Sequence, residues 1–98
     1  ISAPACNGDT VAVVYNAVTP GAYQQEIAAA LAQHPGASYL RTDQACASLK
    51  QSENGSPIYA VYYPGATRAE TCDIRNRIGG GTYARVLDIS TPVGTEIC

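Results

Sequence analysis

The stretch that most constrains the fold is residues 58–78, IYAVYYPGATRAETCDIRNRI, because a strand, a tight turn and a helix follow one another within it. β-Branched and aromatic residues fill positions 58–63, and prolines stand at both ends of that run. Thr67 precedes Glu70 by three residues, the spacing of a capping box, so a helix is expected to begin there. It is expected to end at the glycines 79–81. We interpret this stretch as half of a repeated strand-helix unit.

A second such unit, less clearly marked, comes earlier in the chain. Residues 11–15, VAVVY, predict a strand, and Thr19 followed by Pro20 suits the start of a helix, with the threonine as its cap. That helix is expected over residues 22–34, where alanines favour it and Pro35 then stops it.

Two more strands complete the order. Residues 38–42, SYLRT, alternate in the manner of an edge strand, and residues 83–89, YARVLDI, predict the last strand. The longest irregular stretch is 43–57, in which residues 51–56 form a polar turn. Residues 1–10 are expected to form an N-terminal arm.

The order strand, helix, strand, strand, helix, strand predicts one α+β domain over residues 1–98. Its expected arrangement is ferredoxin-like βαββαβ, a four-stranded antiparallel sheet with two helices on one face and the other face bare. Residues 11–15 and 58–63 are expected at the two central positions, parallel to each other, with the other two strands at the edges. Seven tyrosines are the chain's only aromatic residues besides its histidine, so the core must be aliphatic and tyrosine-based.

The charge balance argues against nucleic acid as a partner. Six Lys and Arg against eight Asp and Glu give a net charge of −2, whereas a phosphate-backbone binder needs a basic patch. No apolar run in the sequence is long enough to span a membrane, so any membrane anchor is expected outside this segment.

The cysteine pattern predicts two disulfides. The four cysteines are widely spaced and lack the close CxxC spacing of zinc or thiol redox sites, which leaves no metal or cofactor site to expect. An even count in a short chain indicates an oxidising, extracytoplasmic compartment, although four free thiols in a cytosolic domain is the alternative. The start of the first strand and the end of the last are expected side by side, so Cys6–Cys98 is the preferred pair. Cys46–Cys72 would then be the other.

Catalysis finds little support in the sequence. His34 is the only histidine and stands at the expected end of a helix, where a surface or capping role suits it better than that of a general base. The carboxylates of Asp43, Glu53, Asp73 and Asp88 are dispersed and form no acid-base pair in the sequence. We therefore expect a protein that is not an enzyme.

The unit at residues 58–78 resembles the second half of the SPOR (sporulation-related repeat) domain, which runs aromatic-x-Val-x-x-Gly-Pro-Phe before a helix rich in Arg-Ala-Glu-Ala. The residues that carry the match are Tyr59, Val61, Thr67, Arg68, Ala69 and Glu70. Cys46-Ala47-Ser48-Leu49, with Cys72 and Cys98, is similar to the four-cysteine SPOR-like domains that end actinobacterial envelope proteins, some of them transmembrane Ser/Thr kinases. Two positions depart from the pattern: Pro64-Gly65-Ala66 stands for Gly-Pro-aromatic, and Asn16 stands for glycine.

The resemblance implies a non-catalytic extracytoplasmic binding module. SPOR domains bind peptidoglycan, especially glycan strands without peptides, across the helix-free face of the sheet. Strand alternation predicts which side chains would lie on that face. These candidate ligand-binding residues are Tyr39, Arg41, Tyr62, Tyr83, Arg85 and Asn16. Tyr62 would lie at the centre, where its replacement by alanine should remove binding and leave the fold intact.

Other interpretations of the same sequence stay open. Tyrosines on an exposed sheet face are also ordinary strand residues, and arginines beside them can simply keep the face soluble. The domain could equally serve as the extracellular sensor or protein-interaction domain of a larger envelope protein. A small secreted enzyme inhibitor is the third alternative, with residues 43–57 as its inhibitory loop.

Overall fold

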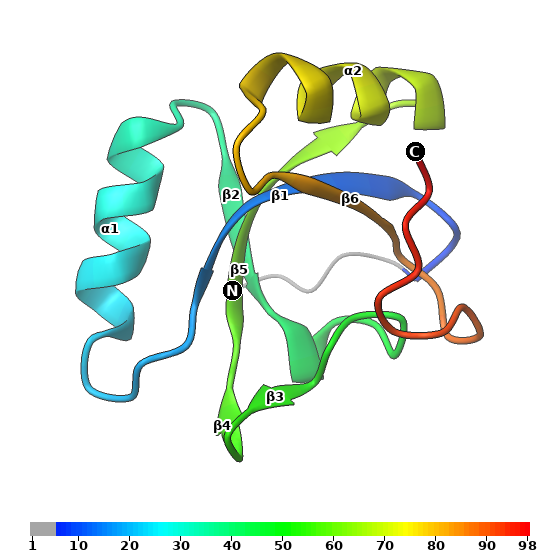
Figure 1. Ribbon diagram of the computed structural model, residues 1–98. Coiled ribbons are helices and arrows are strands. Elements are labelled where there is room, and N and C mark those ends of the chain that lie inside the picture. Colours follow the sequence, from blue (N-terminus) through cyan, green and yellow to red (C-terminus); the bar gives the residue numbers. More distant parts are fainter. Residues whose placement is uncertain (1–5) are drawn as a thin grey trace.

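The computed structural model describes residues 6–98 as one α+β unit, with two helices, a four-stranded antiparallel sheet and a separate two-stranded sheet (Figure 1). The elements in chain order are β1 (Thr10–Ala17), α1 (Tyr23–Gln33), β2 (Ser38–Arg41), a 3-10 turn (Thr42–Gln44), β3 (Ser52–Glu53), β4 (Ser56–Pro57), β5 (Tyr59–Gly65), α2 (Arg68–Ile78) and β6 (Tyr83–Val86). Half of the expected N-terminal arm, residues 1–5, lies outside the described residues. Across residues 6–98, neither helix has the length and apolar character to cross a membrane.

The large sheet has the strand order β2-β5-β1-β6, and every neighbouring pair is antiparallel. The expectation that the two central strands run parallel is therefore wrong. At one end of the β1–β5 pair Thr10 lies opposite Gly65, and at the other end Ala17 lies opposite Tyr59. The reason is that β5 follows β2 through a loop that reverses the chain. Since β5 lies between β2 and β1 and runs antiparallel to both, β1 and β2 have the same direction.

A β-bulge in β1 changes which side chains share a face. Val13 lies opposite Tyr62, but the next paired residue, Tyr15, lies opposite the adjacent Val61, which leaves Val14 as the extra residue. Before the bulge, alternate residues share a face in the ordinary way. Across it the parity changes, so Val13 and Asn16 lie on the same face although they are three residues apart.

Directly opposed residues in antiparallel strands point to the same face, so the register defines two faces. One, which we call the Val11 face, carries Val11, Val13, Asn16, Leu40, Ala60, Tyr62, Tyr83 and Arg85. The other, the Thr10 face, carries Thr10, Ala12, Tyr15, Tyr39, Arg41, Tyr59, Val61 and Ala84. Val13 and Val61 therefore lie on opposite faces of the sheet.

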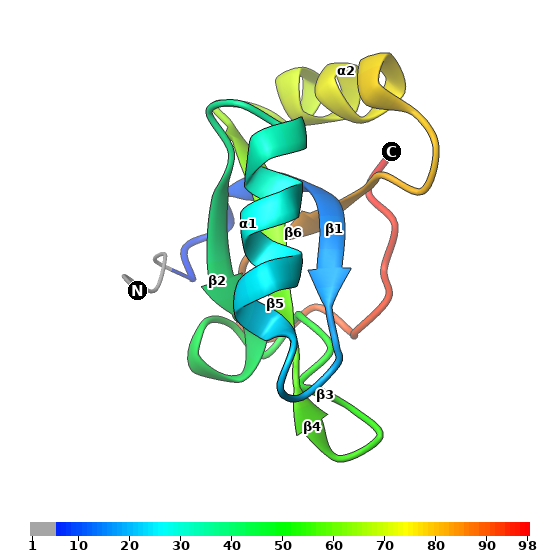
Figure 2. The ribbon, with the colours of Figure 1, turned by 90° about the vertical axis from the view of Figure 1, so that its left-hand side faces the viewer.

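Side chains of the Thr10 face contact both helices, and in the view of Figure 2 α1 lies in front of the sheet with α2 at the top. The ring of Tyr59 lies 4.9 Å from that of Tyr23 in α1. Toward α2, the hydroxyls of Thr10 and Thr71 are 2.6 Å apart and buried. Small residues dominate the buried part of this face, and they allow the helices to approach closely.

The cap predicted for α2 is present in the structure, and the cap predicted for α1 is not. The amide of Glu70 donates to the Thr67 hydroxyl at 3.1 Å, which confirms Thr67 as the cap of α2. At α1 the capping residue is Ala22, with no side-chain hydrogen bond. Thr19 instead lies one turn earlier, where its carbonyl accepts from the Ala22 amide at 3.0 Å.

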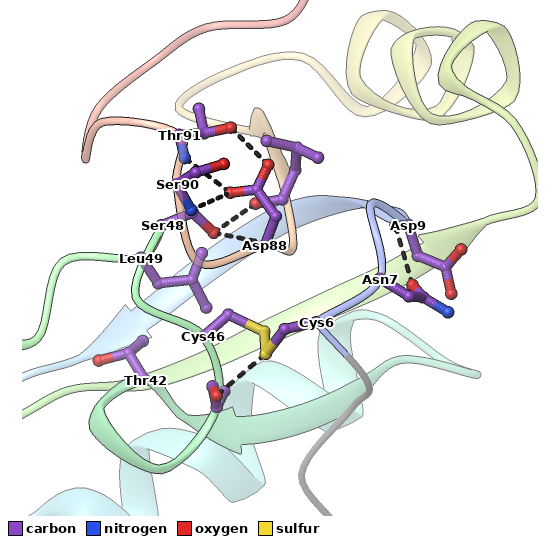
Figure 3. Close-up of a disulfide and its surroundings, with 12 residues drawn as sticks. Cys6, Asn7, Asp9, Thr42, Cys46, Ser48, Leu49, Asp88, Ser90 and Thr91 are labelled. Atoms are coloured by element: carbon purple, nitrogen blue, oxygen red, sulfur yellow. Dashed lines mark hydrogen bonds between the residues drawn. A yellow bond between two sulfur atoms is a disulfide. The ribbon is translucent and has the colours of Figure 1, made fainter.

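The Val11 face is not bare, contrary to expectation, because it carries the main hydrophobic cluster. That cluster comprises Val11, Val13, Leu40, Cys46, Leu49, Ala60 and Leu87. Residues 45–49, which we call the covering segment, lie over the strands there, as Figure 3 shows for Cys46 and Leu49. Ser48 fixes the segment to the end of β6, since its hydroxyl donates to the Val86 carbonyl at 2.6 Å. The chain thus has apolar packing on both sides of its sheet.

Two disulfides are present, as predicted, but the predicted pairing is wrong. The bonds join Cys6 to Cys46 and Cys72 to Cys98. The start of β1 and the end of β6 do lie side by side, with the Gly8 amide donating to the Leu87 carbonyl at 2.8 Å. The covering segment brings Cys46 to that same end, and the C-terminal tail, residues 89–98, continues to α2 before Cys98 bonds (Figure 1).

The stretch expected to be irregular contains a hairpin. β3 and β4 pair with Glu53 opposite Ser56, and the two residues between them have positive φ, 53° at Asn54 and 80° at Gly55. Asn-Gly is the dipeptide that favours such a two-residue turn. The hairpin extends from the bottom of the molecule in the view of Figure 1.

Candidate functional site

A cleft of about 320 Å³ is the candidate site. Its lining comes from the Val11 face, from residues on either side of the β3–β4 hairpin, and from the C-terminal tail. Asn16 of β1 and Tyr83 and Arg85 of β6 belong to the sheet side, while Lys50 and Val93 belong to the other two segments. The volume is near the lower limit of small-molecule sites, suited to one or two sugar rings or a short peptide.

Three polar side chains form a connected row in this cleft. Asn16 Nδ2 donates to the Tyr83 hydroxyl at 2.6 Å. The Arg85 guanidinium lies over the Tyr83 ring, 4.3 Å from its centroid, and Nη1 donates to the Ala84 carbonyl at 2.7 Å. These contacts fix the direction of the tyrosine ring and of the guanidinium before any ligand arrives, which lowers the entropy lost on binding.

Two ion pairs contribute charge to the cleft and its surroundings. Lys50 Nζ and Glu53 Oε2 are 3.0 Å apart, and both side chains are well exposed. Arg85 Nη1 lies 3.5 Å from Glu96 Oε2 of the tail, where the arginine side chain is 19% exposed and the glutamate 41%. The exposed Lys50–Glu53 pair contributes little to stability, and the contact between Arg85 and Glu96 is long for an ion pair, so both pairs leave charge available to a ligand.

A buried hydroxyl in the lining lacks a partner. Thr42 is 4% exposed and lines the cleft, and its Oγ1 makes no hydrogen bond to any of residues 6–98. A buried polar atom without a partner is costly, by about 1 to 3 kcal/mol. A water or a ligand hydroxyl that reached Oγ1 would remove that penalty.

The structure brings together only some of the side chains predicted to bind a ligand. Asn16, Tyr83 and Arg85 line the cleft. Tyr39 and Arg41 lie on the Thr10 face, opposite Val61 and Tyr59 respectively. The alternation expected for β2 was offset by one residue from the observed one, and such an offset moves every side chain of a strand to the other face.

On the Thr10 face Arg41 already has a partner. Its Nε and Nη2 donate to the two carboxylate oxygens of Asp43 at 2.7 and 3.0 Å. This hydrogen bonding from Arg41 lowers the pKa of Asp43, with the positive charge acting in the same direction. The guanidinium of Arg41 is thus satisfied within the chain, unlike that of Arg85.

Tyr62 belongs to the Val11 face but not to the cleft lining. It is half-buried and packs against the hydrophobic cluster, and burial raises the pKa of its hydroxyl. Its replacement by alanine would leave a cavity beside the core, so the expectation of an intact fold conflicts with this packing.

Several cleft residues were missed by the sequence analysis. Lys50, Val93 and Gly94 come from segments without a strand or helix pattern, and their position depends on how those segments cross the sheet. Thr42 ends the predicted edge strand 38–42, but in the structure it belongs to the 3-10 turn that follows β2. The only sequence signal for their neighbourhood was Asn54-Gly55, which marks the hairpin beside Lys50 and Glu53.

Comparisons with known proteins identify no relative. No protein-family model matches this chain, and comparisons with curated proteins and with solved structures return no significant match. Within residues 6–98, no three His, Cys, Asp or Glu side chains come together as a metal site requires.

A second hollow, of about 310 Å³, lies where the C-terminal ends of the two helices meet. His34, Tyr63, Ile74, Arg77 and Ile78 line it. The His34 ring meets that of Tyr63 edge-on at 6.3 Å. Its lining is mainly apolar and aromatic, which suits packing against another surface better than recognition of a polar ligand.

The C-terminal tail leaves β6 through a turn built on Asp88. The Asp88 carboxylate accepts from the Thr91 hydroxyl at 2.5 Å, from the Thr91 amide at 2.8 Å and from the Ser90 amide at 3.2 Å. These hydrogen bonds, with that from the Thr91 side chain the strongest, lower the pKa of Asp88.

A test by pH follows from that lowered pKa. Since the folded-state pKa lies below the unfolded value, Asp88 stabilises the fold above the unfolded pKa and loses this effect as pH falls through the folded pKa. Asp88→Asn is expected to lower the free energy of unfolding at pH 6 and to differ less from wild type near pH 2. Urea denaturation at both pH values measures this. Asp73→Asn, on the exposed side of α2, is the control, and an Asp88 effect that is independent of pH would contradict the turn.

Proposed function

We propose that this chain is a non-catalytic extracytoplasmic binding module for peptidoglycan glycan or another cell-wall fragment, which it holds in the cleft. The observation that carries the proposal is the convergence of Asn16, Tyr83 and Arg85 in one hollow of ligand size. An aromatic ring suits the flat C–H face of a sugar, and amide and guanidinium groups suit its hydroxyl and acyl oxygens.

The fold is consistent with a SPOR-like domain. We propose that the arrangement is ferredoxin-like, with both helices on one face, because α1 and α2 both contact β1 and β5 and the strand order is β2-β5-β1-β6. The ligand surface in this proposal differs from the open sheet face that the family resemblance implies. The covering segment occupies part of that face, and the cleft is what it leaves uncovered.

The two disulfides are compatible with an oxidising, extracytoplasmic location. A cell-envelope protein would meet its glycan ligand in that compartment. Cell-wall glycan, and other envelope proteins beside it, are accordingly the partners we propose.

Replacement of Tyr83 by leucine tests the site. Leucine keeps apolar volume against the hydrophobic cluster but removes the ring face and the hydroxyl that Asn16 contacts. Wild type is expected to bind solubilised cell-wall glycan with a micromolar or weaker Kd, which corresponds to a binding free energy of about −8 kcal/mol or weaker. Tyr83→Leu is expected to weaken this binding about tenfold. Amide chemical shifts of labelled protein measure both the affinity and the location of binding.

Tyr39→Leu is the matched control, since Tyr39 is a tyrosine of the same sheet on the opposite face and is 37% exposed. Its affinity should stay within about twofold of wild type. Equal losses in the two variants would contradict the cleft as the site. No shifts with any wall glycan would contradict the proposed function itself.

The second candidate function is that of a sensor or protein-interaction domain, which the hollow between the helix ends favours. Ile78 there is 36% exposed beside Ile74 and Arg77. In that case the shifts would come from His34, Tyr63 and Ile78 when an envelope protein is added. Shifts confined to the β3–β4 hairpin would instead favour the inhibitor alternative.

A further inference from the structure

We infer that Arg85 is the residue that recognises a carboxylate on the ligand, and that Glu96 of the C-terminal tail partly compensates its charge in the free protein. The inference rests on the proposed function and deepens it, because it names the chemical class of the ligand as anionic. A glycan without a carboxylate would use the same cleft but leave Arg85 with its internal partner.

Arg85 is held in place and still has donors to offer. Its guanidinium rests on the Tyr83 ring, and Nη1 is engaged by the Ala84 carbonyl and lies 3.5 Å from Glu96. Its Nε and Nη2 donate no hydrogen bond to any of residues 6–98. A planar guanidinium with free N–H groups on one edge is the geometry that a carboxylate binds in bidentate fashion.

The contact between Arg85 and Glu96 is weak. At 3.5 Å it is an ion pair longer than a good charged hydrogen bond, and the Glu96 side chain is 41% exposed. The same carboxylate also accepts from the amides of Ile97 and Cys98 at 3.2 Å, so it keeps partners when it leaves the arginine. A ligand carboxylate at the free edge therefore meets a guanidinium whose charge Glu96 compensates only weakly.

The tail that carries Glu96 is attached at both ends. The Asp88 turn holds its start, and the Cys72–Cys98 disulfide joins its last residue to α2. Between these points its Val93 and Gly94 line the cleft. This attachment keeps Glu96 at a high local concentration near Arg85, which explains how a weak pair persists.

Two kinds of cell-wall group carry a carboxylate: a sugar with an acidic substituent and the end of a wall peptide. Three probes separate them. The disaccharide of N-acetylglucosamine and N-acetylmuramic acid carries a lactyl carboxylate, N,N′-diacetylchitobiose has the same sugar backbone without it, and N-acetyl-D-alanyl-D-alanine has the carboxylate without sugar. Each is titrated into the labelled domain, residues 1–98, and followed by amide shifts.

Wild type is expected to bind the muramic-acid disaccharide about tenfold more tightly than diacetylchitobiose, since only the former offers Arg85 a carboxylate. Glu96→Gln should tighten binding of the acidic disaccharide about threefold and leave the neutral one unchanged, because the variant removes a negative charge that lies beside the ligand carboxylate and partly compensates Arg85. Arg85→Gln should abolish the difference between the two disaccharides. Arg68→Gln, an exposed arginine at the start of α2, should keep that difference.

The outcomes separate this inference from the proposed function. Equal wild-type affinity for both disaccharides overturns carboxylate recognition while the glycan-binding module stands. No binding of any of the three probes overturns both. Binding of the dipeptide alone, lost in Arg85→Gln, supports carboxylate recognition and assigns its source to the wall peptide. The first comparison uses wild-type protein only, so it holds even if an Arg85 variant fails to fold.

Discussion

Replacing Cys6 and Cys46 together by alanine is expected to lower the free energy of unfolding by about 4 kcal/mol, the largest effect of any change proposed for this chain. The bond closes a loop of 40 residues, for which the chain-entropy model gives a value of this size. Single domains are stable by about 5 to 15 kcal/mol, so a large share of the total would be lost. The melting temperature should fall by about 20 °C.

Packing makes this disulfide more than an entropic restraint. Cys46 is 3% exposed and belongs to the hydrophobic cluster with Leu40 and Leu49, while Cys6 packs against the same cluster. Figure 3 shows that the bond joins Cys6 to Cys46 of the covering segment, which Ser48 ties to β6. Without the bond, the segment is held mainly by Leu49 and Ser48, and the cleft that borders it should lose its shape.

The second disulfide supplies the matched control. Cys72 and Cys98 close a shorter loop of 26 residues, and Cys98 is exposed at the end of the tail. The Cys72→Ala/Cys98→Ala variant should lose a similar entropic contribution, about 3.5 kcal/mol, but keep the near-UV circular dichroism of its tyrosines. Urea denaturation and circular dichroism measure the two variants.

Peptide mapping without reduction checks the assignment of the bonds directly. A Cys6–Cys46 peptide and a Cys72–Cys98 peptide are expected. Recovery of a Cys6–Cys98 peptide would contradict both the pairing and the path of the covering segment across the sheet. In that case the Cys6–Cys46 loop would not exist, and the loss of about 4 kcal/mol would not be expected.

Local patterns predicted the second half of the fold well. The run of β-branched and aromatic residues before Pro64 became β5, and the Thr67 hydroxyl caps α2 as its spacing from Glu70 indicates. These features depend on residues a few positions apart, where backbone sterics and single hydrogen bonds decide the structure. The start of α1 lacked such a side-chain hydrogen bond, and there the prediction of Thr19 as the cap failed.

The errors in assigning side chains to faces have two physical causes. The bulge at Val14 reverses the alternation within β1, and nothing in VAVVYNA marks which residue is the extra one. The four residues of β2 alternate only weakly between apolar and polar, so their sequence does not decide which face Leu40 takes. The structure buries Leu40 on the Val11 face. Asn16 and Tyr83 consequently meet, while Tyr39 does not join them.

The covering segment could not have been predicted from local pattern. Its position follows from Cys46 and Leu49 reaching the same apolar face that Leu87 and Val11 form, which is a contact between distant parts of the chain. Four cysteines allow three pairings, and sequence alone does not choose among them. The candidate site shares this dependence, since one of its walls comes from residues that precede and follow the hairpin.

Replacing Gly65 by alanine is the other change with a large expected effect. Gly65 ends β5 opposite Thr10, where α2 passes directly over the strand. A Cβ at this position would overlap the Thr71 hydroxyl and lie 2.9 Å from the Thr71 backbone nitrogen. The Thr71 side chain is fully buried and cannot move aside, because its hydroxyl lies 2.6 Å from that of Thr10. We expect Gly65→Ala to lower the free energy of unfolding by about 3 kcal/mol.

The clash with backbone distinguishes this prediction from simple crowding of a side chain. The double variant Gly65→Ala/Thr71→Ala removes the hydroxyl. The Cβ and the backbone nitrogen of residue 71 still lie 2.9 Å from the new methyl group. Less than half of the lost stability should therefore return. Gly81→Ala is the control, since a Cβ there meets no atom within 4 Å, and it should change the free energy of unfolding by at most about 0.5 kcal/mol. If urea denaturation showed Gly65→Ala to be as mild as Gly81→Ala, α2 could not pack against β5 and β1 at this distance.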